Sequence, residues 1–169
     1  MSPLLVLVGP PGAGKSTAGR LLSDRLGVRF RDTDRDIEQE AGKRIAEIFI
    51  DDGEEHFRAL EVAAVEAALA EHDGVLSLGG GAVLAPVTRE RLKGHRVVML
   101  DVDLAAASGR VGLNRDRPVI ALNPRATLKR LLDERMPLYL EVATQVVPTS
   151  GRSVLEVVDD LEQALGSPG

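Results

Sequence analysis

The stretch Gly9-Pro10-Pro11-Gly12-Ala13-Gly14-Lys15-Ser16-Thr17 matches the pattern G-x-x-x-x-G-K-[ST] at every fixed position. An aliphatic run at residues 4–8 precedes it and a helical pattern at residues 15–26 follows it, which is the setting that this motif requires. In such a loop, successive backbone N–H groups surround a phosphate, and the dipole of the next helix adds to the attraction. A plain glycine-rich turn is the competing interpretation. The match in this context predicts a nucleotide-binding α/β protein.

The rest of the chain alternates short aliphatic runs with longer helical patterns. The runs lie at residues 28–30, 75–78, 97–102 and 142–147, and their length predicts strands that are buried on both faces. Helical patterns cover residues 15–26 and 54–71, and further helices are expected to begin at Asn123-Pro124 and at Ser153, where Glu156 completes a capping box. This alternation predicts one α/β domain over residues 1–169, with a parallel sheet that has helices on both faces.

Composition excludes several classes of protein. The 169 residues have a formal net charge of −5 and contain no Cys. The absence of Cys excludes disulfides, thiolate metal sites and thiol nucleophiles, and the acidic total argues against a binder of nucleic acid or of membrane surfaces. No apolar stretch approaches the ~18 residues that span a bilayer, and no basic leader precedes the first strand. We therefore expect a cytoplasmic protein.

A phosphate loop establishes nucleotide binding but does not establish the chemistry. GTPases with this loop need an Asn-Lys-x-Asp motif for guanine, and this chain has none. Residues 112–123 are predicted to form a long loop, and loops of this length are usually functional. Four arginines lie in or near it: Arg110, Arg115, Arg117 and Arg125. A guanidinium there could stabilise charge on a transferring phosphoryl group, so the loop favours a small kinase with a lid.

Three features are candidates for the acceptor side. Asp32 and Asp34 follow the second predicted strand on what we expect to be an extended segment, where side chains two positions apart point the same way. One could serve Mg²⁺ and the other an attacking hydroxyl, or one or both could cap the next helix. Arg58 on its own reads as a surface side chain paired with Glu61 one turn later. The triple glycine at residues 79–81 is either a loose turn or a backbone that closely approaches a ligand.

Taken together, these motifs resemble those of the shikimate kinases over nearly the whole chain. Asp32-Thr33-Asp34 is similar to the family's Asp-x-Asp, and Phe57-Arg58-x-x-Glu61 to its Phe-Arg-x-x-Glu. The triple glycine, Arg117-Pro118 and Arg135-x-Pro-Leu-Tyr139 follow in the family's order. We expect Pro137 in the last motif to interrupt a helix. The resemblance implies a five-stranded parallel sheet of order 2-3-1-4-5, as in nucleoside monophosphate kinases.

The resemblance also implies a role for each motif. Shikimate kinases phosphorylate the 3-hydroxyl of shikimate with ATP and Mg²⁺, on the route to chorismate and the aromatic amino acids. The implied catalytic residues are Lys15, Asp34 and Arg117, and the implied metal residues are Ser16 and Asp32. ATP would be bound by Gly12, Ala13, Gly14, Lys15, Ser16, Thr17, Arg110, Arg117 and Arg152. Shikimate would be bound in the region of residues 32–61 and by the segments after it, through Asp34, Phe49, Phe57, Arg58, Gly79, Gly80, Gly81 and Arg135.

Two alternatives remain at this stage. Another small P-loop kinase, such as a gluconokinase, also takes a hydroxy acid, so paired arginines for a carboxylate do not discriminate between the two. A nucleotide-binding module without transfer activity is the other alternative, although an intact Lys15, Ser16, Asp34 and Arg117 argue against it. We expect a monomer whose partners are ATP and shikimate, with no nucleic acid and no membrane.

Overall fold

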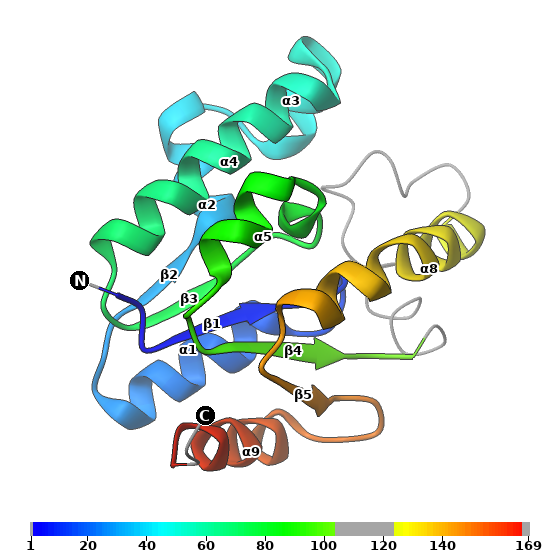
Figure 1. Cartoon of the computed structure of the whole chain (residues 1–169). Helices are drawn as coiled ribbons and strands as arrows, with labels where there is room; N and C mark the ends of the chain where they lie inside the picture. Colours follow the sequence, from blue (N-terminus) through cyan, green and yellow to red (C-terminus); the bar gives the residue numbers. More distant parts are fainter. Residues whose placement is uncertain (1, 104–123, 167–169) are drawn as a thin grey trace.

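The computed structural model describes residues 2–103 and 124–166, and its centre is a five-stranded sheet (Figure 1). All strand pairs are parallel and the order is β2-β3-β1-β4-β5, which confirms the predicted sheet. The strands are β1 (Leu5–Val8), β2 (Phe30–Asp32), β3 (Val75–Ser77), β4 (Val97–Asp101) and β5 (Gln145–Pro148). In β1, alternate side chains point to opposite faces of the sheet, so its aliphatic run supplies both hydrophobic layers.

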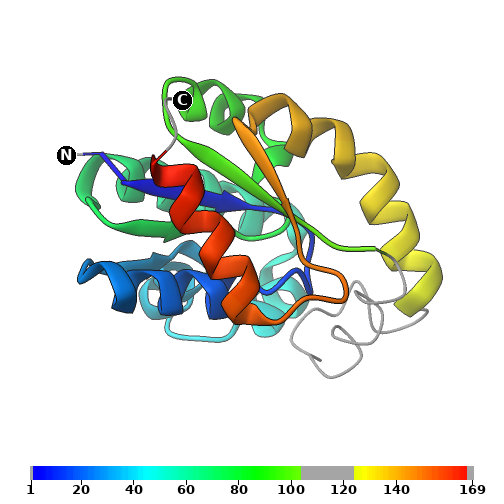
Figure 2. The same cartoon turned by 90° about the horizontal axis from the view of Figure 1, so that it is seen from below.

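Helices cover both faces of the sheet (Figure 2). Their bounds are α1 (Lys15–Leu26), α2 (Thr33–Ala41), α3 (Ile45–Asp52), α4 (Glu54–Glu71), η1 (Ala82–Leu84), α5 (Pro86–Leu92), α8 (Pro124–Val142) and α9 (Val154–Gly166). Leu5 and Leu7 share a core cluster with α1 and α9, whereas Val6 and Val8 share one with α4, α5 and α8. No helix in the described part of the chain is long and apolar enough to cross a membrane.

The two edge strands depart from the prediction that every strand is buried on both faces. All three residues of β2 are half-buried, and Val147 is the buried residue of β5, whose other three residues are exposed. Each edge strand has a neighbour on one side only, so less of its surface is covered. The predicted last strand also began too early, because Val142 is the final residue of α8 and β5 starts at Gln145.

The helix α8 passes through Pro137, which corrects the expectation that this proline interrupts it. A proline removes one backbone donor, and its ring crowds the preceding turn. Pro137 itself is exposed, whereas Arg135 and Tyr139 on either side are buried. Packing of these neighbours therefore holds the helix together across a locally unfavourable residue.

The bounds of α2, α3 and α5 were not predicted from the sequence, and α2 was expected only as the helix that Asp32 or Asp34 could cap. The helices α2 and α3 pack with α4 in a third hydrophobic cluster beside β2, formed by Ile37, Ile45, Ile48 and Phe57. This cluster is separate from the two sheet layers, and it holds the Asp-x-Asp segment and the start of α4 on the same side of the molecule. The fold therefore brings the candidate acceptor residues together.

Candidate active site

The phosphate loop joins the end of β1 to the start of α1, as its sequence predicts. A side-chain carbon on Gly9 would lie 2.5 Å from the carbonyl oxygen of Leu100, so only glycine fits where the loop leaves the sheet. Within the loop, Lys15 Nζ donates to the carbonyl oxygens of Gly9 and Pro10, at 2.7 and 3.0 Å. The ammonium group is thereby held over the loop, at the N-terminus of a helix that favours anions.

Ser16 and Asp32 meet beside this loop. The Ser16 hydroxyl donates to Asp32 Oδ2 at 2.8 Å, and Asp32 Oδ1 accepts the backbone N–H of Asp34 at 2.9 Å. Asp32 is therefore also the N-cap of α2, which was the competing interpretation of this residue. Burial, followed by the nearby Asp34 carboxylate, raises the pKa of Asp32, and the hydrogen bond from Ser16 offsets part of that rise.

Asp34 lies in the first turn of α2 and not on an extended segment, because the strand ends at Asp32. A side-chain carbon on Gly79 would lie 2.6 Å from Asp34 Oδ1 and 2.9 Å from Glu61 Oε2. The same carbon on Gly81 would clash with the guanidinium of Arg58. The triple glycine is thus a close approach of backbone to charged groups, and the loose-turn interpretation is wrong.

Arg58 is not the solvated surface side chain that its helix pattern alone suggested. Its side chain is 21% exposed, and its Nη1 lies 2.8 Å from Oε1 of Glu61, whose side chain is only 4% exposed. Its Nε also contacts Glu54 at 3.4 Å. Because a buried carboxylate needs a counter-charge, Glu61 holds the guanidinium against the backbone of Gly81.

Phe49, Phe57 and Arg135 are the remaining residues that the sequence assigned to the acceptor. The rings of Phe49 and Phe57 lie 4.9 Å apart, with Phe57 fully buried in the third cluster and Phe49 at its margin. Arg135 is buried on α8, which comes from a distant part of the chain. One turn later on the same helix, the hydroxyl of Tyr139 donates to the carbonyl of Gly80 at 2.5 Å.

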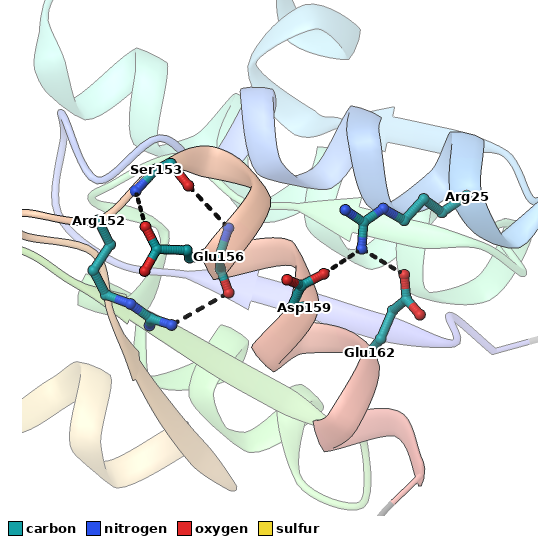
Figure 3. A network of polar contacts seen from close by, with 6 residues as sticks. All are labelled: Arg25, Arg152, Ser153, Glu156, Asp159 and Glu162. Carbon is teal, nitrogen blue, oxygen red and sulfur yellow. Dashed lines mark hydrogen bonds and ion pairs between the residues drawn. The ribbon is translucent and has the colours of Figure 1, made fainter.

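A pocket lies between the phosphate loop with the start of α1 and the start of α9. It has a volume of about 230 Å³ and is lined by Ala13, Gly14, Thr17, Ala18, Thr149, Arg152, Val154 and Val157. Arg152 donates to the carbonyls of Pro148 and Glu156 and pairs with Asp160 at 2.8 Å. Figure 3 shows Arg152 and the predicted capping box of Ser153 and Glu156, whose two reciprocal hydrogen bonds are 3.1 and 3.2 Å long. Aliphatic walls and one planar cation suit a heterocyclic base.

Most of the predicted site residues lie in two adjoining groups. Asp34, Arg58 and the triple glycine meet on the α2–α4 side, whereas Arg152 lies beyond the phosphate loop. Arg110, Arg117 and the segment 112–123, which is predicted to be a lid, lie outside the described residues.

Sequence reasoning treated Glu61 only as the surface partner of Arg58 and assigned no role to Tyr139, yet both lie beside the other candidate acceptor residues. Glu61 is the buried partner of Arg58, and Tyr139 binds the backbone of Gly80. Both residues belong to motifs that resemble those of the family. The burial of Glu61 depends on the whole fold, and the partner of Tyr139 lies 59 residues away in the sequence, so neither feature has a local signal.

Comparison with known proteins places the chain in a family. The shikimate kinase family profile matches residues 11–166. A shikimate kinase of Salinispora arenicola is 62% identical over 153 residues, which cover 90% of this chain and 92% of that protein. One of Salinispora tropica is 58% identical over 167 residues, covering 99% of this chain and 100% of that protein.

Among solved structures, shikimate kinase from Acinetobacter baumannii in complex with shikimate matches with a TM-score of 0.91 and 35% identity. The match covers 96% of this chain and 92% of that chain. The long sequence matches and this structural match agree on one family. The chain belongs to the shikimate kinase family, whose members are phosphotransferases with an alcohol acceptor.

Proposed function

We propose that this chain transfers the γ-phosphoryl group of ATP to the 3-hydroxyl of shikimate. The observation that supports this most strongly is the position of the triple glycine. A side-chain carbon on Gly80 would lie 2.9 Å from Pro11 of the phosphate loop, while the flanking glycines lie against Asp34 and Arg58. An acceptor held by Asp34 and Arg58 would therefore lie next to the donor phosphates, which is the proximity that phosphoryl transfer needs.

On the donor side, we assign the phosphates to the backbone of Gly12, Ala13 and Gly14 and to Lys15, Ser16 and Thr17. The Ser16 hydroxyl and the Asp32 carboxylate are oxygen donors 2.8 Å apart, and Mg²⁺ in kinases takes one or two such ligands together with substrate phosphates. The pair therefore fits Mg²⁺, with Asp32 acting through a water. When bound, Mg²⁺ neutralises charge on the phosphate oxygens. Lys15 would leave the carbonyls of Gly9 and Pro10 to reach the β- and γ-phosphates.

On the acceptor side, Asp34 would hold the ring hydroxyls of shikimate. As the 3-hydroxyl oxygen bonds to the γ-phosphorus and the bond to the ADP oxygen breaks, the Asp34 carboxylate would take the hydroxyl proton. Arg58 and Arg135 would bind the shikimate carboxylate, for which paired guanidiniums are suited. Gly79, Gly80 and Gly81 would contact the substrate through the backbone, and Phe49 and Phe57 would pack beside it.

The remaining arginines would serve the nucleotide. Arg152 lines the pocket of about 230 Å³ next to Gly14, and we assign the adenine to this pocket. The family resemblance assigns Arg110 to the other side of the base and Arg117 to the phosphates, as part of a lid over residues 112–123. We further propose that the chain functions as a single domain and a monomer in the cytoplasm, which sedimentation and cell fractionation would test.

The substrate is tested by measuring ADP release with ATP and Mg²⁺ and with shikimate, gluconate or AMP in parallel. We expect release to depend on shikimate, with the other two acceptors near the background rate. Release stimulated by gluconate would favour the gluconokinase alternative, and release without dependence on any acceptor would favour a module without transfer activity. The product should be shikimate 3-phosphate, which phosphorus NMR distinguishes from inorganic phosphate.

A further inference from the structure

Tyr139 makes a contact that none of the assigned roles uses. It is the one tyrosine of the chain, its exposure is 0%, and its hydroxyl donates to the carbonyl oxygen of Gly80 at 2.5 Å. The donor lies on α8 and the acceptor lies after β3, so the hydrogen bond ties two distant segments together. Phenylalanine would fill the same space, so packing alone does not explain why a hydroxyl is buried here.

The bonded carbonyl belongs to the peptide between Gly80 and Gly81. Glycine on both sides of a peptide leaves its plane free to rotate, because no Cβ restricts the neighbouring dihedral angles. In a trans peptide the carbonyl and the N–H point in opposite directions. By holding the carbonyl toward α8, Tyr139 therefore directs the N–H of Gly81 away from that helix.

The triple glycine at residues 79–81 lies between the proposed acceptor site and the phosphate loop. Gly79 lies against the Asp34 carboxylate, Gly80 against Pro11, and Gly81 against the Arg58 guanidinium. Arg135 precedes Tyr139 by four residues on α8, so the two side chains lie on the same face of the helix, and both are buried. The Tyr139 hydrogen bond thus fixes α8, and with it Arg135, relative to the backbone beside Arg58.

We propose that Tyr139 is a positioning residue for the acceptor. Its hydroxyl fixes the orientation of the Gly80–Gly81 peptide and the position of α8 relative to that peptide. Arg58 and Arg135 are then already in place to bind the acceptor carboxylate as a pair. The proposal rests on the acceptor site described above. Tyr139 itself need not touch the substrate. Its effect is on acceptor binding, because the groups that it aligns belong to the acceptor side.

The first test is Tyr139→Phe, which removes the hydroxyl and keeps the ring. Without the hydroxyl, the Gly80–Gly81 peptide and α8 are held less firmly beside the acceptor, so we expect the KM for shikimate to rise on the order of tenfold. The KM for ATP should stay within about twofold, because the phosphate loop is held by its own contacts. Ser23→Ala is the matched control, since its buried hydroxyl also donates to a backbone carbonyl, that of Gly19, at 2.8 Å.

The kinetic pattern distinguishes positioning from simple stabilisation. Each variant removes one buried hydroxyl that donates to a backbone carbonyl, but Ser23→Ala should leave the KM for shikimate unchanged. An unchanged KM for shikimate in Tyr139→Phe, or equal rises for ATP and shikimate, would overturn the proposal. Failure of the wild-type protein to turn over shikimate would instead refute the proposed function, so the two failures are distinguishable.

A second measurement uses the wild-type sequence and does not depend on how well a variant folds. Labelling with 3-fluorotyrosine gives a single fluorine resonance, because the chain has one tyrosine. We expect shikimate to shift this resonance in a saturable titration and ATP alone to shift it much less. A resonance that saturating shikimate leaves in place would contradict a link between Tyr139 and the acceptor site.

Discussion

The guanidinium of Arg58 lies between a buried carboxylate of its own helix and the backbone of Gly81. The orientation of this side chain is therefore set before any substrate arrives, and less conformational entropy has to be lost on binding. Asp34 is likewise held through its own backbone, by the cap from Asp32. At the scale of single residues, the proposed acceptor side therefore consists of charges that neighbouring groups hold in place.

Arg58→Ala should raise the KM for shikimate by at least about tenfold and leave the KM for ATP within about twofold, because a charge-assisted contact is worth about 1.5–3 kcal/mol. Steady-state kinetics with each substrate varied in turn measures this. Arg91→Ala is the control, since Arg91 also pairs with a carboxylate of α4, Glu66, at 3.3 Å. Unchanged shikimate binding in Arg58→Ala would refute the carboxylate assignment.

Asp34→Asn should fold and bind ATP, yet lower kcat by about 10²–10⁴-fold, because a general base that cannot accept a proton loses that share of the rate. Asp36→Asn, in the same turn of α2 and paired with Arg31 at 2.6 Å, is the control and should keep near-normal kcat. Single-turnover measurements would separate the chemical step from binding. Normal turnover by Asp34→Asn would exclude a role in proton transfer.

Asp32 makes stability depend on pH. The fold raises the pKa of Asp32 above its ordinary value. At pH values between these two pKa values, the native state binds more protons than the unfolded state. The free energy of unfolding therefore falls as pH increases through this range. Asp32→Asn keeps the cap and the contact with Ser16. Without ligands it should therefore have a higher Tm than the wild type at neutral pH, and this difference should shrink as pH falls toward about 4.

The control for this pH dependence is Asp73→Asn, for which the expected sign is the opposite. A hydrogen bond from Arg29 lowers the pKa of Asp73, so losing its charge should lower Tm at neutral pH. If Asp32→Asn instead has a lower Tm than the wild type at neutral pH, and by the same amount at every pH, burial does not destabilise the charged Asp32 carboxylate.

At the scale of elements, α9 links the C-terminal part of the chain to the nucleotide side. Arg25 of α1 reaches Asp159 and Glu162 of α9 at 2.7 and 2.9 Å (Figure 3), and α9 also supplies Val154 and Val157 to the pocket that we assign to the adenine. The N-terminus of α9 is held by the capping box of Ser153 and Glu156. The start of this helix is therefore both a stability element and a wall of the pocket.

Ser153→Ala should lower stability by about 1 kcal/mol, because the N–H of Glu156 loses its acceptor. For a chain of this size the loss corresponds to about 2–4 °C in Tm, which calorimetry measures. We expect the KM for ATP to rise slightly and the KM for shikimate to stay constant. Ser153→Asp, which keeps an acceptor oxygen, should restore Tm; if it does not, the capping interpretation is wrong.

At the scale of the whole molecule, the net charge of −5 is unevenly distributed. Residues 34–73 hold four basic and thirteen acidic side chains, and most of these charges lie on α2, α3 and α4. The proposed substrate sites instead contain a few arginines and Lys15, which carboxylates and backbone carbonyls hold in place. An acidic protein can therefore bind two small anions, because binding depends on the local field rather than on the total charge.

Ligands that bind only the folded state should stabilise it by mass action. With ADP and Mg²⁺ at 100 times their Kd, we expect about 2.7 kcal/mol of added stability, visible as a rise in Tm. A chelator should remove most of this shift if Ser16 and Asp32 hold Mg²⁺, and Asp32→Asn should show a smaller metal-dependent shift than the wild type. A chelator-insensitive shift would argue against this metal site.

The sequence by itself determined the phosphate loop, the parallel sheet and the family. A phosphate loop of fixed length between an aliphatic strand and a helix can be read locally, because all of its groups lie within nine consecutive residues. The capping box at Ser153 was predictable for the same reason, since it closes within four residues. The continuity of α8 through Pro137 was not predictable, because packing outweighs a local preference there.

Only the tertiary structure decided how the acceptor side is assembled. The burial of Glu61, the approach of Gly79 to Asp34 and the bond from Tyr139 to Gly80 join segments far apart in the sequence. Their energetic weight comes from exclusion of water, which depends on the whole fold and leaves no local pattern. Arg58 illustrates the difference: its helix spacing indicated a surface ion pair, and its surroundings make it part of a preorganised site.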